Sequence, residues 1–230
     1  MKKIILLVVL LLIVAFIFYI YVSFNGLPWK KTQVSNELKQ YVEEKYDIEV
    51  DIEESYFNFK FDHYGTIFKL RDDKEFSFSA EKRRDNAIHD YYPEAVWEKE
   101  VKEDLTPLID SSFDSLSVDR YGVYPVNGIG NLEDIQKDVP SYKDVQTGIN
   151  SVIHFKEEHS SKTEEALIKE VFSFIQKVNE KGIRNIELTF DLKEQEQEEE
   201  KPKTFYITIP SDKLNTIKTE DDIKKYIKEF

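Results

Sequence analysis

Histidines are the residues of this chain best suited to metal binding and proton transfer. They stand at His63, His89, His154 and His159. A zinc hydrolase places two histidines four residues apart on a helix, with a glutamate between them, and none of the four has such a partner. The chain also has no cysteine, which excludes thiolate ligands, thiol catalysis and disulfides. We therefore predict no metal site, and surface hydrogen bonding is the ordinary role of such histidines.

Glycine and serine motifs give no support to nucleotide binding or acyl transfer. Gly128 and Gly130 form a Gly-x-Gly fragment in NGIGN, but a third glycine and a following helix are missing. The sequence contains neither a Gly-x-Ser-x-Gly motif nor a phosphate-loop lysine motif. We predict no cofactor site.

Carboxylate pairs are the remaining candidates for acid–base chemistry. Asp72-Asp73 and Asp221-Asp222 could act together in a cleft, but a chain with 45 acidic residues contains such pairs by default. We interpret the first pair as a turn and the second as favourable charge in the first turn of a helix. The run KEQEQEEEK, residues 193–201, reads as a solvated loop without the fixed geometry that a calcium site needs. We predict no catalytic residue.

An aromatic-rich stretch could bind a partner. Its members are Tyr56, Phe57, Phe59, Phe61, Tyr64 and Phe68. Core packing with cross-strand contacts is the simpler interpretation. The alternative is an exposed aromatic groove for a peptide, a wall polymer or a membrane partner, with Tyr56, Phe57 and Tyr64 as its surface.

Residues Ile4 to Phe24 form an apolar run without a single charge. As a helix that rises about 1.5 Å per residue, this run would span about 31 Å, which matches a hydrocarbon core of about 30 Å. A cleaved signal peptide has an apolar core of about 7–15 residues that ends in small residues. This run is longer and ends in the bulky sequence YIYVSF. We therefore predict a retained membrane anchor rather than a cleaved signal or a buried helix of a soluble domain.

Aromatic and basic residues follow the apolar run at its predicted exit from the membrane. The predicted membrane-interface residues are Tyr19, Tyr21, Trp29, Lys30 and Lys31. Lys2 and Lys3 precede the run and nearly balance the lysines after it, so the positive-inside rule does not fix the orientation. A short tail ahead of a long span is usual for a signal anchor, so we expect a cytoplasmic amino terminus and an extracytoplasmic bulk.

Charge and length limit the partners and the domain count. The net charge is −13 for the whole chain and −16 for residues 31–230, because Lys2, Lys3 and Lys30 precede them. Phosphate backbones and anionic lipid surfaces repel such a domain, so we predict no nucleic acid partner. We predict an anchor and its exit in residues 1–30, an α+β domain in 31–124, a linker or irregular crossover in 125–148, and a second α+β domain in 149–230.

Periodicity predicts a helix followed by an antiparallel sheet. Residues 32–46 have apolar side chains at helical spacing, and residues 48–52 alternate apolar and acidic side chains like a half-buried strand. Phenylalanines alternate through residues 57–61, which predicts a second strand. Tyr64-Gly65 reads as the turn after it, and FSFSA at residues 76–80 reads as a further strand.

The rest of the chain alternates helices and strands. We expect helices in 86–109, where Pro93 opens or kinks the helix, in 163–180 and from Thr219 onward, with strands in 116–124, 151–157, 186–192 and 205–209. The fold class is thus α+β, with one transmembrane helix, a helix-plus-antiparallel-sheet unit and a second small α+β unit whose helices cover one sheet face.

The amino-terminal sequence resembles a known family. The apolar anchor, the exit GLPWKK, the helix ending YVEEKY, the strands of IEVDIEESYFNFKFDHYG and the later FSFSA are similar to the YfjL-like family of membrane-anchored proteins from Bacillus-type bacteria. The resemblance covers mainly the first eighty residues. It implies a single-pass Gram-positive membrane protein and supplies no catalytic or binding residues.

These observations predict a protein that is not an enzyme. We expect the lipid bilayer to hold it through residues 4–24, and an extracytoplasmic domain to bind a protein, peptide or envelope component. The alternatives are an envelope hydrolase that uses a carboxylate pair and a structural, membrane-tethered spacer.

Overall fold

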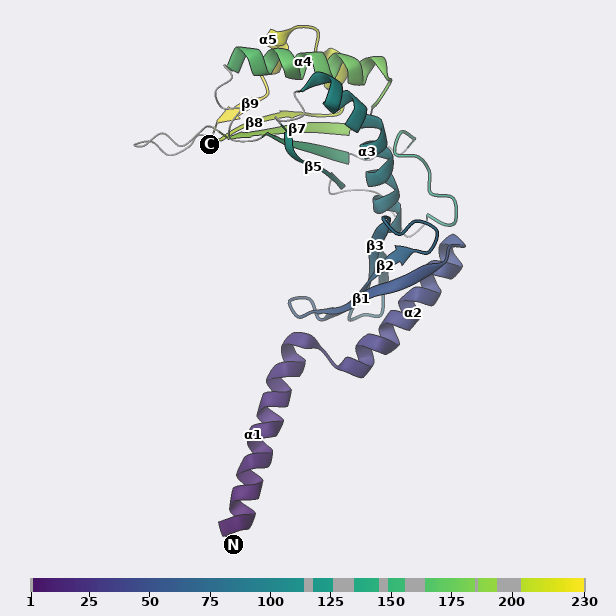
Figure 1. Ribbon diagram of the computed structural model, residues 1–230, viewed down its shortest axis with the longest axis vertical. Helices are drawn as coiled ribbons and strands as arrows, with labels where there is room; N and C mark the ends of the chain where they lie inside the picture. Colours follow the sequence, from purple (N-terminus) through teal and green to yellow (C-terminus); the bar gives the residue numbers. More distant parts are fainter. Residues whose placement is uncertain are drawn as a thin grey trace, which may run out of the picture. The chain divides into compact units, whose positions relative to one another are not determined.

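The computed structural model describes residues 2–113, 118–125, 135–144, 149–155, 164–184, 186–193 and 204–229 (Figure 1). The chain divides into two compact units. Unit 1 comprises Met1–Ala95 and Glu133–Val139, and unit 2 comprises Val96–Leu132 and Pro140–Phe230. Each unit combines helices with a β-sheet, so the predicted α+β class is confirmed. Much of the predicted crossover 125–148 lies outside the described residues.

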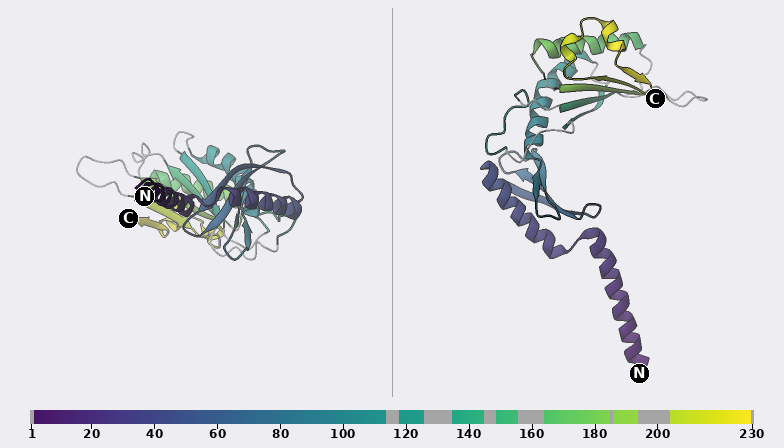
Figure 2. Two further views of the ribbon diagram at one scale, coloured as in Figure 1. Left: turned by 90° about the horizontal axis from the view of Figure 1, so that it is seen from below. Right: turned by 180° about the vertical axis from the view of Figure 1, so that it is seen from behind.

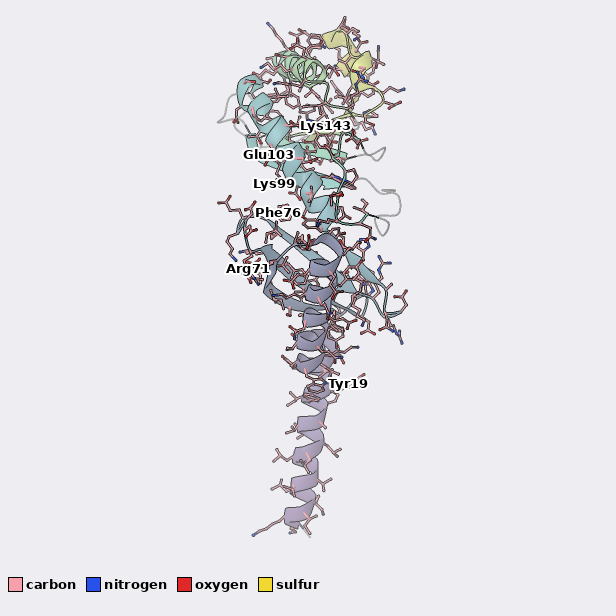
Figure 3. All side chains as sticks on the ribbon, turned by 90° about the vertical axis from the view of Figure 1, so that its right-hand side faces the viewer. Tyr19, Arg71, Phe76, Lys99, Glu103 and Lys143 are labelled. Atoms are coloured by element: carbon pink, nitrogen blue, oxygen red, sulfur yellow. The ribbon has the colours of Figure 1, made fainter. Side chains whose placement is uncertain are left out.

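Unit 1 begins with an apolar helix, α1 (Lys2–Asn25), that buries none of its described side chains. Its side chains, including Tyr19, project outward around the helix (Figure 3). By length and composition α1 could cross a membrane, as the sequence predicts. Gly26, in the left-handed region at φ 69°, then allows the chain to turn into a second helix.

The second helix, α2 (Pro28–Tyr46), is the predicted amphipathic helix. Pro28 stands in its first turn, where a missing N–H removes no helical hydrogen bond, and Asp47 ends it with a left-handed φ of 55°. The buried stripe of α2 consists of Val34, Ser35, Leu38, Val42 and Tyr46. This stripe faces sheet A, whose buried residues include Val50, Phe68, Phe78 and Ala80.

Sheet A is antiparallel in the order β1-β2-β3-β4. Its strands are β1 (Val50–Asn58), β2 (His63–Leu70), β3 (Ser77–Lys82) and β4 (Ile88–Asp90). Two local predictions were wrong. Phe59 and Phe61 lie in the turn after β1 instead of in a second strand, and Tyr64-Gly65 lies within β2 instead of in a turn. The phenylalanine alternation continues the period of β1, so periodicity alone cannot show where the strand ends.

The predicted burial of β1 is correct at Val50 and wrong at Ile52. Ile52 is 37% exposed, although it pairs with the buried Phe68 of β2. The pairing register with β2 shifts directly after it, between Ile52 and Glu54. The predicted helix over 86–109 also begins too early, because β4 occupies Ile88–Asp90 and helix α3 (Tyr92–Ser112) follows with Pro93 in its first turn.

In unit 2, the part of α3 from Val96 onward is held by the segment 140–144. The indole Nε1 of Trp97 donates to the carbonyl oxygen of Pro140 at 2.6 Å. The hydroxyl of Tyr142 donates to Asp104 Oδ2 at 2.6 Å, and the carboxylate of Glu100 accepts the backbone N–H of Tyr142 at 3.0 Å. Trp97 and Tyr142 are both buried, so these contacts between α3 and residues 140–144 form part of the core of the unit.

Sheet B of unit 2 has the order β5-β6-β7-β8-β9. The strands are β5 (Val118–Pro125), β6 (Ile149–Phe155), β7 (Ile186–Lys193), β8 (Thr204–Ile209) and β9 (Ile227–Glu229). The β6–β7 pair is parallel and is joined through α4 (Glu164–Glu180), whereas the other neighbours are antiparallel. Strands β7 and β8, which match the strands predicted in 186–192 and 205–209, pair antiparallel.

Helices cover one face of sheet B, as predicted. Helix α4 lies over this face together with the short helices η3 (Leu214–Thr216) and α5 (Glu220–Lys224) (Figures 1 and 2). The core beneath α4 contains Val171, Phe174, Ile153, Phe190 and Ile207, all of them buried. Because strand side chains alternate between faces, residues 150, 152 and 154 of β6 lie on the opposite face.

Candidate functional site

The junction between α1 and sheet A is built from an aromatic pair. The rings of Phe57 and Tyr64 lie 4.8 Å apart, centroid to centroid, on neighbouring strands. A Cβ atom at Gly26 would lie 2.8 Å from Phe57 and 2.9 Å from Tyr64, so only glycine fits against these rings. The backbone N–H of Leu27 donates to the Tyr64 hydroxyl at 3.1 Å, and Lys30 Nζ lies 4.6 Å from the centre of the Tyr64 ring. The pair thus fixes the end of α1 to the domain.

The third predicted aromatic residue, Tyr56, covers a glycine of the neighbouring strand. A Cβ atom at Gly65 would lie 2.2 Å from the Tyr56 ring, so the ring needs glycine beneath it. The Tyr56 hydroxyl donates to Glu81 Oε1 at 2.9 Å, and His63 Nδ1 lies 3.4 Å from the other carboxylate oxygen of Glu81. Burial raises the pKa of Tyr56 above its ordinary value. Tyr64 is only 7% exposed. A partner-binding role for Tyr56, Phe57 and Tyr64 stays a prediction.

The predicted membrane-interface residues surround this junction. Tyr19 and Tyr21 are exposed on α1, and Trp29 is 62% exposed in the first turn of α2, beside Lys30 and Lys31. Their contact with lipid stays a prediction.

A buried carboxylate, Asp90, lies where β4 meets α2. The Tyr46 hydroxyl donates to Asp90 Oδ1 at 2.5 Å. Lys45 Nζ and the Tyr41 hydroxyl donate to Oδ2 at 3.0 and 3.4 Å. The hydrogen bond with Asp90 raises the pKa of Lys45 against the opposing effect of burial. Both oxygens of Asp90 are therefore engaged, which is how a buried charge is stabilised.

A second acid, Glu94, lies close to this cluster in the first turn of α3. Burial, followed by the negative charge of Asp90, raises the pKa of Glu94 to about 7. Its Oε2 atom is buried and has no hydrogen-bond partner among the described residues. The sequence did not single out Asp90 or Glu94, because their proximity to Lys45 and Tyr46 depends on how β4 packs against α2.

The two predicted carboxylate pairs lie in a turn and in the first turn of a helix, the positions that their sequence context indicated. Asp73 accepts the backbone N–H groups of Glu75 and Phe76 in the turn before β3. Asp222 closes a capping box with Thr219 at the start of α5. Its contacts with Lys225 and the backbone lower the pKa of Asp222. A hydrolase that uses a carboxylate pair stays a prediction.

Polar side chains form a row on the face of sheet B opposite α4. Asn150 Nδ2 donates to Glu187 Oε1 at 2.9 Å, and His154 Nδ1 lies 2.8 Å from Asp191 Oδ2. Asp191 is buried, whereas His154 is partly exposed beside it. Asp191 Oδ1 and Asn150 Oδ1 are buried without a hydrogen-bond partner in the described part of the chain. We call these four residues the polar face of sheet B.

The remaining histidines and glycines of the sequence prediction are unrelated to this row. The ring of His89 packs on Tyr91, with 4.5 Å between centroids. His159, Gly128, Gly130 and residues 194–201 lie outside the described residues. Within the described ranges, no three histidine or acidic side chains gather closely enough to hold a metal ion.

Comparisons with known proteins identify the amino-terminal region. No curated protein matches the chain. A solved structure of a DUF5037 family protein from Ruminococcus gnavus matches with a TM-score of 0.36 and 10% identity, over 70% of this chain and 76% of that one, and at this level it carries no argument. Residues 1–91 match the family model described as YfjL-like, N-terminal domain, which confirms that this part of the chain is similar to the YfjL-like family.

Proposed function

We propose that this chain is a single-pass membrane protein of a Gram-positive envelope whose extracytoplasmic domain binds a peptide, protein or envelope component without catalysis. One observation supports the role of α1 as a membrane anchor. Helix α1 buries none of its described side chains, while its carboxyl end is fixed to a folded unit. Large contiguous apolar surfaces are unfavourable in water, so a bilayer is the environment that stabilises this helix.

The junction between α1 and sheet A also limits the movement of unit 1 relative to the anchor. Gly26 seats the chain against Phe57 and Tyr64, and the hydrogen bond from Leu27 ties the backbone to the sheet. A flexible linker would leave the domain free to tumble at the surface. The packed junction instead holds unit 1 beside the end of α1, which suits a protein that presents a domain at the membrane.

The polar face of sheet B is our candidate for the ligand surface. Its buried acceptors, Asp191 Oδ1 and Asn150 Oδ1, have no partner among the described residues, although buried polar atoms are normally hydrogen-bonded. Asp191 engages His154 Nδ1, so Nε2 is the ring nitrogen that remains for a ligand. A surface rich in acceptors favours a ligand rich in N–H and O–H donors, such as a peptide amine or a wall sugar.

Co-sedimentation of the full-length protein in nanodiscs with a purified Gram-positive cell-wall preparation tests this proposal. We expect the native protein to sediment with the wall, and the H154A/D191N variant to lose most of that binding. Asp221→Asn changes an exposed acid on α5, which lies over the other face of the sheet, and should bind like the native protein. Equal sedimentation of all three proteins, or of none, would contradict a wall ligand at the polar face.

A further inference from the structure

Two phenylalanines stand exposed at the turn between β1 and β2. Phe59 is 53% exposed and Phe61 is 64% exposed, with Lys60 between them. Asp62 completes the turn with a left-handed φ of 56°. We call residues 59–62 the hairpin tip. Large aromatic side chains gain little by facing water, so a pair of them at a turn indicates a surface that contacts something apolar.

The hairpin tip lies beside the end of the apolar helix. The ring of Phe59 is 5.3 Å from the ring of Phe24, centroid to centroid, and Phe24 is the last residue of the apolar run. Gly26 packs on Phe57, two residues before the tip. Figures 1 and 2 show this turn next to the carboxyl end of α1. If α1 spans a bilayer, the tip is therefore at the level where the helix leaves it.

Basic residues lie around the same end of sheet A. Lys60 is in the tip, and Arg84 Nε lies 3.9 Å from Asp62 Oδ2, which brings the turn after β3 to the tip. Arg83 and Arg84 are exposed in that turn. Lys30 and Lys31 are in the first turn of α2, on the other side of the junction. Asp62 and Asp85 lie in the same two turns, so these five basic and two acidic residues carry a local charge of +3, in contrast with the net charge of −13 for the chain.

The opposite end of sheet A has a different surface. There Arg71 forms ion pairs with Glu49 and Asp51, and Lys74 pairs with Asp51 at 2.6 Å. Acids and bases thus neutralise each other at that end, on an ordinary solvated surface. Among the described residues of sheet A and its turns, the exposed phenylalanines, Phe59 and Phe61, lie at the end that adjoins α1, beside Lys60 and Arg84. Aromatic rings beside lysine and arginine are the side chains that bind the headgroup region of a membrane.

We propose that the hairpin tip inserts Phe59 and Phe61 into the headgroup region of the bilayer that α1 spans, and that Lys60, Arg83 and Arg84 bind its anionic lipids. The domain is then attached at two points, the helix and the tip, so its tilt on the membrane is restricted. This inference rests on α1 as the anchor, which belongs to the proposed function, but it holds for either orientation of the chain. The overall acidity does not oppose it, because charges beyond a screening length of about 8 Å contribute little.

Site-specific fluorescence tests the proposal, because a chain without cysteine can carry a single label at a chosen position. We would place an environment-sensitive fluorophore at Lys60→Cys, Ile52→Cys or Val14→Cys in the full-length protein. Each labelled protein would be reconstituted into nanodiscs with and without nitroxide-bearing lipids. Ile52 is the matched control, because it is an exposed apolar residue of β1, the strand that leads to the tip. It lies roughly 20 Å from the tip along β1. Val14 reports whether α1 is inserted.

We expect strong quenching at Val14, quenching at Lys60 several-fold above that at Ile52, and weaker quenching at Lys60 when anionic lipid is replaced by neutral lipid. In the protein labelled at Lys60→Cys, the additional substitutions F59S and F61S should reduce quenching to the extent seen for the label at Ile52→Cys. Both phenylalanines are exposed, so this variant should fold, which unchanged circular dichroism would verify. Equal quenching at Lys60 and Ile52, or a Lys60 signal that survives the serine substitutions, would overturn the proposal while leaving the anchor intact. Absence of quenching at Val14 would overturn the anchor and the tip together.

Discussion

Two buried carboxylates, one in each unit, show how the same chemical group can be used differently. Asp90 in unit 1 accepts hydrogen bonds from Tyr46, Lys45 and Tyr41, so both of its oxygens are engaged. Asp191 in unit 2 has one oxygen on His154 and one without a partner among the described residues. Burial alone therefore does not identify a binding site. The informative feature is the hydrogen-bonding capacity that remains after folding.

The largest effect should follow from removing the satisfied carboxylate. We predict that Asp90→Ala lowers the free energy of unfolding by about 3–5 kcal/mol, because it leaves the ammonium group of Lys45 buried without its partner. Urea unfolding of the full-length protein in detergent, followed by circular dichroism, measures this. Asp90→Asn keeps the shape and should lose less. A loss below about 1 kcal/mol for Asp90→Ala would remove the contrast with Asp191.

The next effect concerns Glu94 and its dependence on pH. Its pKa is about 7 in the folded protein and 4.5 for the ordinary side chain, so the folded state binds the proton more tightly than the unfolded state. Protonated Glu94 therefore stabilises the folded state relative to charged Glu94. Its contribution to the free energy of unfolding is fully present below about pH 4.5, decreases as the pH rises to about 7 and is absent above that. Glu94→Gln should raise the free energy of unfolding by about 2 kcal/mol at pH 8 and change little at pH 4.

Unfolding curves at both pH values check this prediction. Glu75→Gln, which changes an exposed acid in the turn before β3, serves as the control and should change neither curve. Equal curves for Glu94→Gln and the native protein at pH 8 would show that the charged Glu94 is not penalised by burial.

The smallest effect on stability should come from Asp191. We predict that Asp191→Asn lowers the free energy of unfolding by less than about 1 kcal/mol, because an amide oxygen can still accept a hydrogen bond from His154. The same urea experiment in detergent provides the measurement. A loss as large as that of Asp90→Ala would make Asp191 a structural residue and weaken the case for the polar face.

Local sequence patterns predicted α1, α2, α4 and most strands, because each depends on the spacing of neighbouring side chains. The residues of the candidate sites depend on contacts between distant segments. His154 meets Asp191 because β6 and β7 pair in parallel, and Lys45 meets Asp90 because α2 packs beside β4. Gly65 resembles a turn residue, but its actual role is to accept the Tyr56 ring from the neighbouring strand. These partners become visible only when the register between elements is known.

We propose that α1 spans the membrane and places the folded units outside the cell, and the accessibility of single cysteines to a membrane-impermeant reagent tests this topology. Two variants of the full-length protein, Lys2→Cys and Asp212→Cys, would be expressed in a Gram-positive host and treated with a membrane-impermeant maleimide. Asp212 is exposed in unit 2, and Lys2 precedes the apolar run. We predict labelling of Asp212→Cys in intact cells and of Lys2→Cys only after lysis. The reverse pattern would invert the topology, and labelling of both positions only after lysis would contradict an extracytoplasmic domain.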